Sequence, residues 1–310
     1  MNFPTMRRAI TRRAALASAL TAAPVLMLVR PSLAQGSAAP AGAGSNGTAS
    51  DMAARLAGLE RRNGGRLGVA ALNLATGNRV GHRGGERFPM CSTFKVLASA
   101  LVLARVDQGK ERLDRRVAFT KADLIPWSPI TEKHADGPGL TMADYCEATI
   151  TYSDNTAGNM LLNSFGGPAG LTAYLRSIGD GVTRLDRTEP TLNEAIPGDP
   201  RDTTSPDAML DTLRRLLFGN ALSEASRAQL AAWMIANTTG GKRLRAGFPS
   251  DWRVGDKTGT GSLGTANDVA VAWPPKGGPI LVTVYYTGST ISDDRRNAVI
   301  AEAGRIVAGV

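Results

Sequence analysis

A serine and a lysine three residues apart could carry out acyl transfer in this chain. Ser92 and Lys95 lie in residues 88–95, and on a helix both side chains would share one face. A serine hydroxyl needs an adjacent base to become a nucleophile, and a lysine can be that base once burial or a nearby cation lowers its pKa. Pro89 and the apolar residues 94–104 predict that a buried helix begins here.

Two further motifs follow in order, Ser-Asp-Asn at 153–155 and Lys-Thr-Gly at 257–259. Composition alone predicts roughly 0.002 joint occurrences of the three motifs, so chance is a poor explanation. Ser153 could pass a proton to a leaving nitrogen, with Lys257 keeping that hydroxyl polarised. Asn155 could hydrogen-bond a substrate amide or the lysine of the first motif. Together these residues predict a serine acyl-transfer site.

The three motifs resemble those of the class A serine β-lactamases, and the resemblance extends over residues 51–310. It includes residues 186–194, which match the omega loop of that family. By this resemblance Glu189 and Asn193 hold the water that releases the acyl group. Penicillin-binding proteins share the three motifs but lack this glutamate, so Glu189 predicts a hydrolase.

The resemblance also implies roles for main-chain groups and for the loop that carries Glu189. The backbone N–H groups of Ser92 and Thr260 are expected to bind the oxyanion. Arg187 is expected to pair with Asp202, and the bond before Pro190 is expected to be cis. Whether Lys95 or Glu189 is the base for acylation stays open.

The substrate carboxylate needs a cation, and four residues are candidates to bind it: Lys257, Thr258, Thr260 and Arg243. Arg243 matches an arginine found in several cephalosporin- and carbapenem-hydrolysing branches of the family. A solvated arginine in a basic turn is the alternative. Trp127 matches the aromatic residue at the rim of the family's cleft.

The chain has two cysteines, Cys91 and Cys146, and we expect both to be small buried thiols. Branches with strong carbapenemase activity often bridge the cysteine that matches Cys91 to a second one, at the position where this chain has Gly261. That bridge cannot form here. We therefore predict hydrolysis of penicillins and cephalosporins, with carbapenems an open substrate class.

The N-terminus predicts export. Residues 1–34 combine paired arginines, an apolar stretch and Ser-Leu-Ala before Gln35, which is typical of a cleaved signal of the twin-arginine type. A membrane anchor is the alternative, but the stretch is short and interrupted by polar residues. Removing the five arginines of this segment from a formal charge of +9 leaves +4. We expect a periplasmic monomer with a flexible segment at residues 35–50.

Periodicity predicts an α+β fold. A first helix is expected from Ser50 or Asp51 to about Gly64, and a last helix over residues 293–308. A hairpin is expected over 67–74 and 79–82. Further strands are expected over 251–259, 267–273 and 280–287. The chain ends would then form one antiparallel sheet flanked by helices around an inserted helical region.

The predicted organisation has two lobes. The α/β lobe would comprise residues 51–87 and 243–310, and the helical lobe residues 88–242 with an omega loop at about 187–202. A cleft between two such lobes is a common place for a site.

Other functions fit the sequence less well. His82 and His134 are the only histidines and lie in no ligand-spaced cluster, which disfavours a metal centre and a Ser-His-Asp triad. We expect no cofactor. A charge of +4 gives no support for nucleic-acid binding. A cell-wall peptidase or transpeptidase and a non-catalytic β-lactam sensor stay as rivals. Glu189 argues against the first, and the lack of a spanning segment after residue 34 against the second.

Overall fold

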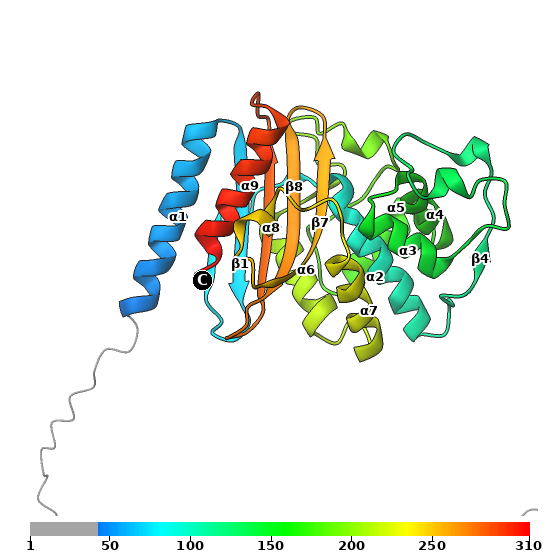
Figure 1. Ribbon diagram of the computed structural model, residues 1–310, viewed down its shortest axis with the longest axis horizontal. Coiled ribbons are helices and arrows are strands. Elements are labelled where there is room, and N and C mark those ends of the chain that lie inside the picture. Colours follow the sequence, from blue (N-terminus) through cyan, green and yellow to red (C-terminus); the bar gives the residue numbers. More distant parts are fainter. Residues whose placement is uncertain (1–42) are drawn as a thin grey trace, which may run out of the picture. The chain divides into compact units, whose positions relative to one another are not determined.

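A five-stranded antiparallel sheet forms the centre of the fold (Figure 1). The structure, a computed structural model, describes residues 43–310 and side chains from Thr48 onward, so the predicted signal at 1–34 lies outside the described residues. The strand order is β2-β1-β9-β8-β7. The strands are β1 Arg66–Asn73, β2 Arg79–His82, β7 Arg253–Gly261, β8 Thr265–Trp273 and β9 Ile280–Thr287. The predicted α+β fold, with one sheet built from both chain ends, is confirmed.

Pairing of β1 with β9 joins the two chain ends, with Arg66 opposite Thr287 and Asn73 opposite Ile280. Both faces of the sheet are buried, and successive side chains alternate between two apolar cores. On β8, for example, Val269 and Val271 belong to one core and Ala270 to the other. Burial on both faces explains why most of these strands are rich in apolar residues and could be predicted from the sequence.

Helices at the two chain ends cover one face of the sheet (Figure 1). They are α1 Ala43–Asn63, α8 Leu244–Gly247 and α9 Asp293–Val307. α1 begins at Ala43, so the predicted start at Ser50 or Asp51 is wrong, and residues 43–50 of the segment expected to be flexible belong to this helix. Burial of Leu56 and Leu59 anchors this helix, and extending a formed helix adds one hydrogen bond for each residue fixed. Residues 35–42 lie outside the described part of the chain.

The inserted region is helical and packs on the opposite face of the sheet. Its helices are α2 Phe94–Asp107, α3 Met142–Thr151, α4 Asn155–Ser164, α5 Gly167–Ser177, α6 Pro206–Phe218 and α7 Glu224–Ile235. α2 lies at the centre of the insert and is buried over residues 94–104, as its apolar composition predicted. A buried central helix can hold a polar group near its end in a fixed position.

Short pairings connect the start of α2 to the rest of the fold. Pro89 lies in β3 Phe88–Pro89, which pairs with β6 Thr203–Thr204, and not in the helix itself. A 3-10 turn, η1 Cys91–Thr93, then leads into α2. Ser92 therefore lies at the entrance of the buried helix.

The turn between β7 and β8 is shorter than we predicted. β7 continues to Gly261 rather than Gly259, and β8 begins at Thr265 rather than Asn267. Glycine has a low strand propensity, so the Thr-Gly-Thr-Gly sequence led us to end the predicted strand too early. The longer strand brings Thr260 into the sheet.

Truncation of the central helix should destabilise the fold. We expect Leu97→Ala to lower the free energy of unfolding by about 2–5 kcal/mol, because Leu97 is fully buried in α2 and its loss leaves a cavity. Leu263→Ala is the matched control, since Leu263 is 53% exposed, and should change stability by less than about 0.5 kcal/mol. Urea unfolding of both variants measures this. Equal losses for the two variants would contradict a packing role specific to α2.

Candidate active site

The four predicted catalytic side chains meet at the N-terminal end of α2. Ser92 Oγ lies 3.2 Å from Glu189 Oε1, and Lys95 Nζ lies 3.1 Å from the same oxygen. Ser153 Oγ lies 3.4 Å from Lys95 Nζ, and the Ser153 carbonyl oxygen lies 2.8 Å from it. The structure thus brings together residues that are up to 97 positions apart in the sequence.

Lys95 is completely buried and is surrounded by polar partners. Besides Ser153 and Glu189, its ammonium group donates to Asn155 Oδ1 at 2.6 Å. Burial lowers the pKa of Lys95, and the nearby Glu189 carboxylate only partly opposes this. A lysine with a lowered pKa is the type of base that the sequence predicted beside Ser92.

Lys257 is the second fully buried lysine, and it holds the hydroxyl of Ser153. Its Nζ donates to Ser153 Oγ at 3.0 Å and to Thr258 O at 2.8 Å. Burial and the positive charge of Lys95 lower the pKa of Lys257 well below its usual value. Ser153 adopts a φ of 58°, in the left-handed region, and its Oγ lies between the two lysines, 3.4 Å from Lys95 Nζ. The Ser153 hydroxyl can therefore exchange protons with either ammonium group.

Glu189 is held through its main chain and its carboxylate. Asn193 Nδ2 donates to Glu189 Oε2. Asn159 clamps the Glu189 backbone, since its Oδ1 accepts the Glu189 N–H at 3.0 Å and its Nδ2 donates to the Glu189 carbonyl at 2.9 Å. Sequence reasoning missed Asn159. Its position four residues after Asn155, on the same face of α4, was the signal that could have found it.

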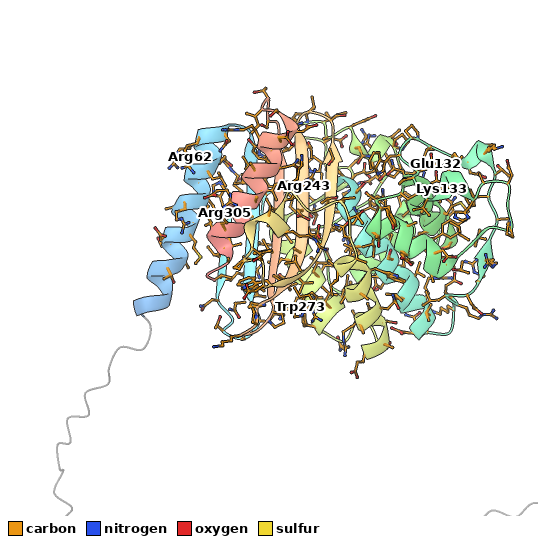
Figure 2. All side chains as sticks on the ribbon, in the orientation of Figure 1. Arg62, Glu132, Lys133, Arg243, Trp273 and Arg305 are labelled. Carbon is orange, nitrogen blue, oxygen red and sulfur yellow. The ribbon has the colours of Figure 1, made fainter. Side chains whose placement is uncertain are left out.

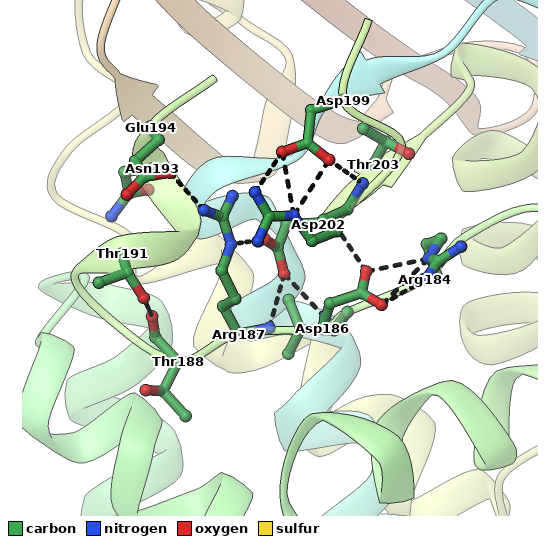
Figure 3. Close-up of polar contacts among 12 residues, drawn as sticks. Arg184, Asp186, Arg187, Thr188, Thr191, Asn193, Glu194, Asp199, Asp202 and Thr203 are labelled. Carbon is green, nitrogen blue, oxygen red and sulfur yellow. Dashed lines mark hydrogen bonds and ion pairs between the residues drawn. The ribbon is translucent and has the colours of Figure 1, made fainter. Parts of the chain in front are cut away.

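The loop that carries Glu189 is closed at its neck by an ion pair between the half-buried Arg187 and the buried Asp202 (Figure 3). Arg187 Nε donates to Asp202 Oδ2 at 2.6 Å. Asp202 Oδ1 also accepts the backbone N–H groups of Asp186 and Arg187, at 2.8 and 2.9 Å. The Glu189–Pro190 bond is cis. Both features of this loop that the family resemblance implied are confirmed.

The site opens into a cavity of about 510 Å³. Its lining includes eight of the predicted residues, Ser92, Trp127, Ser153, Asn155, Asn193, Arg243, Thr258 and Thr260, and two that we did not predict, Thr239 and Asp293. Trp127 is 66% exposed, and its carbonyl accepts the Asn155 N–H at 2.9 Å. Lys95, Lys257 and Glu189 are buried beneath this lining.

Arg243 is a buried residue of the cavity wall and not a solvated surface arginine. Figure 2 labels its position near the strands of the sheet. It donates through Nη1 to the carbonyls of Gly259 and Asn267, both at 2.7 Å, and through Nη2 to Thr260 Oγ1 at 2.7 Å. Its Nε donates to Asn297 Oδ1 of α9 at 2.8 Å. These contacts place its positive charge beside Thr260, at the edge of β7.

The predicted oxyanion donors lie on suitable elements. Ser92 begins the α2 region, where backbone N–H groups lack helical partners. β7 is an edge strand, so alternate N–H groups along it face away from β8. The assignment of the Ser92 and Thr260 N–H groups as an oxyanion hole stays a prediction.

Both cysteines are buried free thiols, as predicted. Burial raises the pKa of Cys91, with a further contribution from the charge of Glu189. A Cβ atom at Gly261 would lie only 2.6 Å from Cys91 Sγ. The position that carries a bridging cysteine in other branches is therefore adjacent to Cys91 in space.

Among residues 43–310, which the structure describes, no cluster of three or more His, Cys, Asp or Glu side chains has the arrangement of a metal site. None of the helices in this part of the chain combines the length and apolar character needed to span a bilayer.

Comparison with known proteins is consistent with this geometry. A sequence model of the β-lactamase enzyme family matches residues 49–310. The chain is 52% identical to β-lactamase OXY-2 of Klebsiella oxytoca, over 82% of this chain and 87% of that protein. It is 50% identical to β-lactamase Toho-1 of Escherichia coli, again over 82% and 87%.

Solved structures show the same similarity. An ancestral (GNCA) class A β-lactamase is 67% identical, with a TM-score of 0.82, over 83% of this chain and 98% of that one. The putative class A β-lactamase PenP from Rhodopseudomonas palustris is 62% identical, with a TM-score of 0.82, over 84% and 99%. The chain therefore belongs to the class A serine β-lactamase family, whose members hydrolyse the β-lactam ring.

Proposed function

We propose that this protein hydrolyses penicillins and cephalosporins through an acyl intermediate on Ser92, and so confers resistance to them. The observation that carries the proposal is the contact between Ser92 Oγ and Glu189 Oε1, 3.2 Å apart, beside a buried lysine and a cavity large enough for a small molecule. A nucleophile and a carboxylate within one hydrogen bond of each other can act on the same carbonyl carbon in turn.

Acylation begins when Ser92 Oγ attacks the lactam carbonyl carbon and gives its proton to Lys95 or Glu189. The carbonyl oxygen becomes an oxyanion, and the N–H groups of Ser92 and Thr260 would stabilise it. The ring C–N bond then breaks, and Ser153 donates its proton to the leaving nitrogen. Lys257, 3.0 Å from Ser153 Oγ, supports that transfer and can return a proton to the hydroxyl.

Deacylation needs a water on the correct face of the ester. Glu189 would take a proton from this water, whose oxygen attacks the acyl carbon, and the proton then passes to the departing Ser92 oxygen. Asn193 supports this role, because its Nδ2 already contacts Glu189 and its buried Oδ1 has no donor among the described residues. A carboxylate in this position favours a hydrolase over a transpeptidase or a sensor that stays acylated.

Substrate recognition is assigned to the cavity lining. Arg243 in the lining, and Lys257 beneath it, would supply positive charge for the substrate carboxylate, with the hydroxyls of Thr258 and Thr260 as hydrogen-bond donors. Asn155 would bind the substrate's side-chain amide, and the exposed ring of Trp127 would contact its apolar part. Carbapenems remain an open substrate class, because the bridge from Cys91 is impossible at Gly261.

Location and organisation are proposed from the sequence. We propose that residues 1–34 direct export and are removed, that the enzyme acts in the periplasm as a monomer, and that it uses no cofactor and no nucleic acid. The cavity would lie between an α/β lobe of residues 51–87 and 243–310 and a helical lobe of residues 88–242.

Replacing the Glu189 carboxylate should separate the two half-reactions. We expect Glu189→Gln to be acylated by a penicillin and then to turn over about 10²–10⁴ times more slowly, because the amide cannot take a proton from water. Intact-mass spectrometry of mixed enzyme and substrate should show a persistent adduct. Glu194→Gln is the control on the same loop, where the carboxylate is 47% exposed and contacts Arg187. Unchanged turnover in Glu189→Gln would remove the role proposed for this residue.

Removing the Arg243 guanidinium should weaken substrate binding. We expect Arg243→Ala to raise KM for a penicillin about tenfold or more, since one charge-assisted contact to the carboxylate is lost. Lys242→Ala, at an exposed neighbour paired with Asp294, should leave KM within about twofold. Steady-state kinetics with a penicillin and its carboxylate methyl ester test this. The assignment fails if Arg243→Ala affects the acid and the ester equally.

A further inference from the structure

Two buried carboxyl groups lie beneath the turn that carries Arg243. Asp256 of β7 and Asp268 of β8 are both 0% exposed. In the strand register Asp268 is opposite Thr258, which makes Asp256 and Asp268 diagonal neighbours on one face of the sheet. Diagonal neighbours of this kind lie within reach of each other, and both carboxyl groups are excluded from water. Two ionised carboxylates buried side by side repel each other and can only accept hydrogen bonds, which favours one proton on the pair.

The hydrogen-bond donors around the pair are unevenly shared. Asp256 Oδ1 accepts from Arg245 Nε in an ion pair, and Asp256 Oδ2 accepts from Asn237 Nδ2 at 2.7 Å. Asp268 Oδ2 accepts only the Leu244 N–H, at 3.0 Å. Asp268 Oδ1 is buried and has no donor among the described residues. Donors stabilise the ionised form of Asp256, so the shared proton belongs on Asp268 Oδ1.

The charged groups around Asp268 come from β7, α8, α9 and the turn before α8. β7 contributes Asp256 and, one residue further, Lys257, while α8 contributes Arg245 and the preceding turn Arg243. The register neighbour on β9 is the apolar Val284, and α9 places Arg296 near Arg243. Among titratable groups further away, Lys95 acts on Lys257, Cys91 acts on Arg243, and Tyr285 senses the charge of Asp268.

Arg243 makes no ion pair with any described carboxylate. Its donors contact two carbonyls, the hydroxyl of Thr260 and the amide of Asn297. An ionised Asp268 would place a second negative charge beneath this guanidinium. That charge would weaken the positive electrostatic potential that attracts a substrate carboxylate to Arg243. A neutral Asp268 leaves the charge of Arg243 directed to the cavity.

We propose that Asp268 is a protonated carboxylic acid which donates its Oδ1 hydrogen to Asp256, accepts the Leu244 N–H, and so positions Arg243 without neutralising it. Asp268 is then a positioning residue, which acts through the Arg243 turn. The inference rests on the carboxylate-binding role proposed for Arg243.

This protonation state makes stability depend on pH in a definite direction. Burial and the negative charge of Asp256 raise the pKa of Asp268 well above its usual value. A carboxyl group whose pKa is higher in the folded than in the unfolded protein contributes stability in full below about pH 4, the unfolded value. That contribution is lost as the pH rises from there through the folded pKa.

Asp268→Asn tests the proton directly, because the amide is neutral, donates to Asp256 and still accepts the Leu244 N–H. The Tm of the variant should match the parent near pH 4 and exceed it increasingly as the pH rises to 8. Infrared difference spectra at pH 8 should show the C=O stretch of a protonated carboxylic acid in the parent and not in Asp268→Asn. A Tm difference that does not change with pH, or an absent band in the parent, would overturn the proposal.

Steady-state kinetics distinguish a role of Asp268 in positioning Arg243 from a role in protein stability alone. Asp268→Ala removes both hydrogen bonds and should raise KM for a penicillin about tenfold with a smaller change in kcat, whereas Asp268→Asn should keep both within about twofold. An Asn variant with a KM as high as that of the Ala variant would mean that the negative charge is needed, and the proposal would fail. If Asp268→Ala does not fold, the infrared spectra, the Tm series and the kinetics of Asp268→Asn decide whether the proposal holds. A parent enzyme that opens no β-lactam would defeat the proposed function, while the spectra and the Tm series would still decide where the proton lies.

Discussion

The burial of the Lys95 ammonium is the constraint on which the rest of the site depends. An isolated ammonium group in a protein interior is very unfavourable, so a lysine in this position must be surrounded by acceptors or lose its proton. The fold supplies Glu189 from one loop, and Ser153 and Asn155 from another segment, all within 3.1 Å of Nζ. Each of these partners is itself fixed in place, and the same arrangement brings Ser92 and Ser153 to the cavity.

Two main-chain hydrogen bonds fix the loop that carries Glu189 to the rest of the site. The Met90 N–H donates to the Asp202 carbonyl at 2.9 Å, so the neck of the loop is bonded to the chain just before the nucleophile. The Ser262 N–H donates to the Asn193 carbonyl at 2.9 Å, which attaches the other part of the loop to the β7–β8 turn. Glu189 thus lies between two points of attachment, one at α2 and one at the sheet. A carboxylate fixed in this way loses little freedom when it positions water.

The sequence predicted local features better than long-range contacts. Runs of apolar residues marked the hairpin and most of the C-terminal strands, because the sheet is buried on both faces. The helical start at Ala43 was missed, since weak helix formers there depend on packing further along α1. Three short motifs located Ser92, Lys95, Ser153 and Lys257. Asn159 and Asp268 have no motif, because their partners lie 30 and 24 residues away and only the folded chain brings them together.

The central claim is that the acyl group forms on the hydroxyl beside Lys95. The most direct measurement is to quench the enzyme in acid during penicillin turnover, digest it with trypsin and map the adduct by mass spectrometry. Cleavage after Arg87 and Lys95 isolates the peptide of residues 88–95. Our account predicts the mass of one intact penicillin on this peptide, located at Ser92. An adduct on any other residue, or turnover without any covalent adduct, would contradict it.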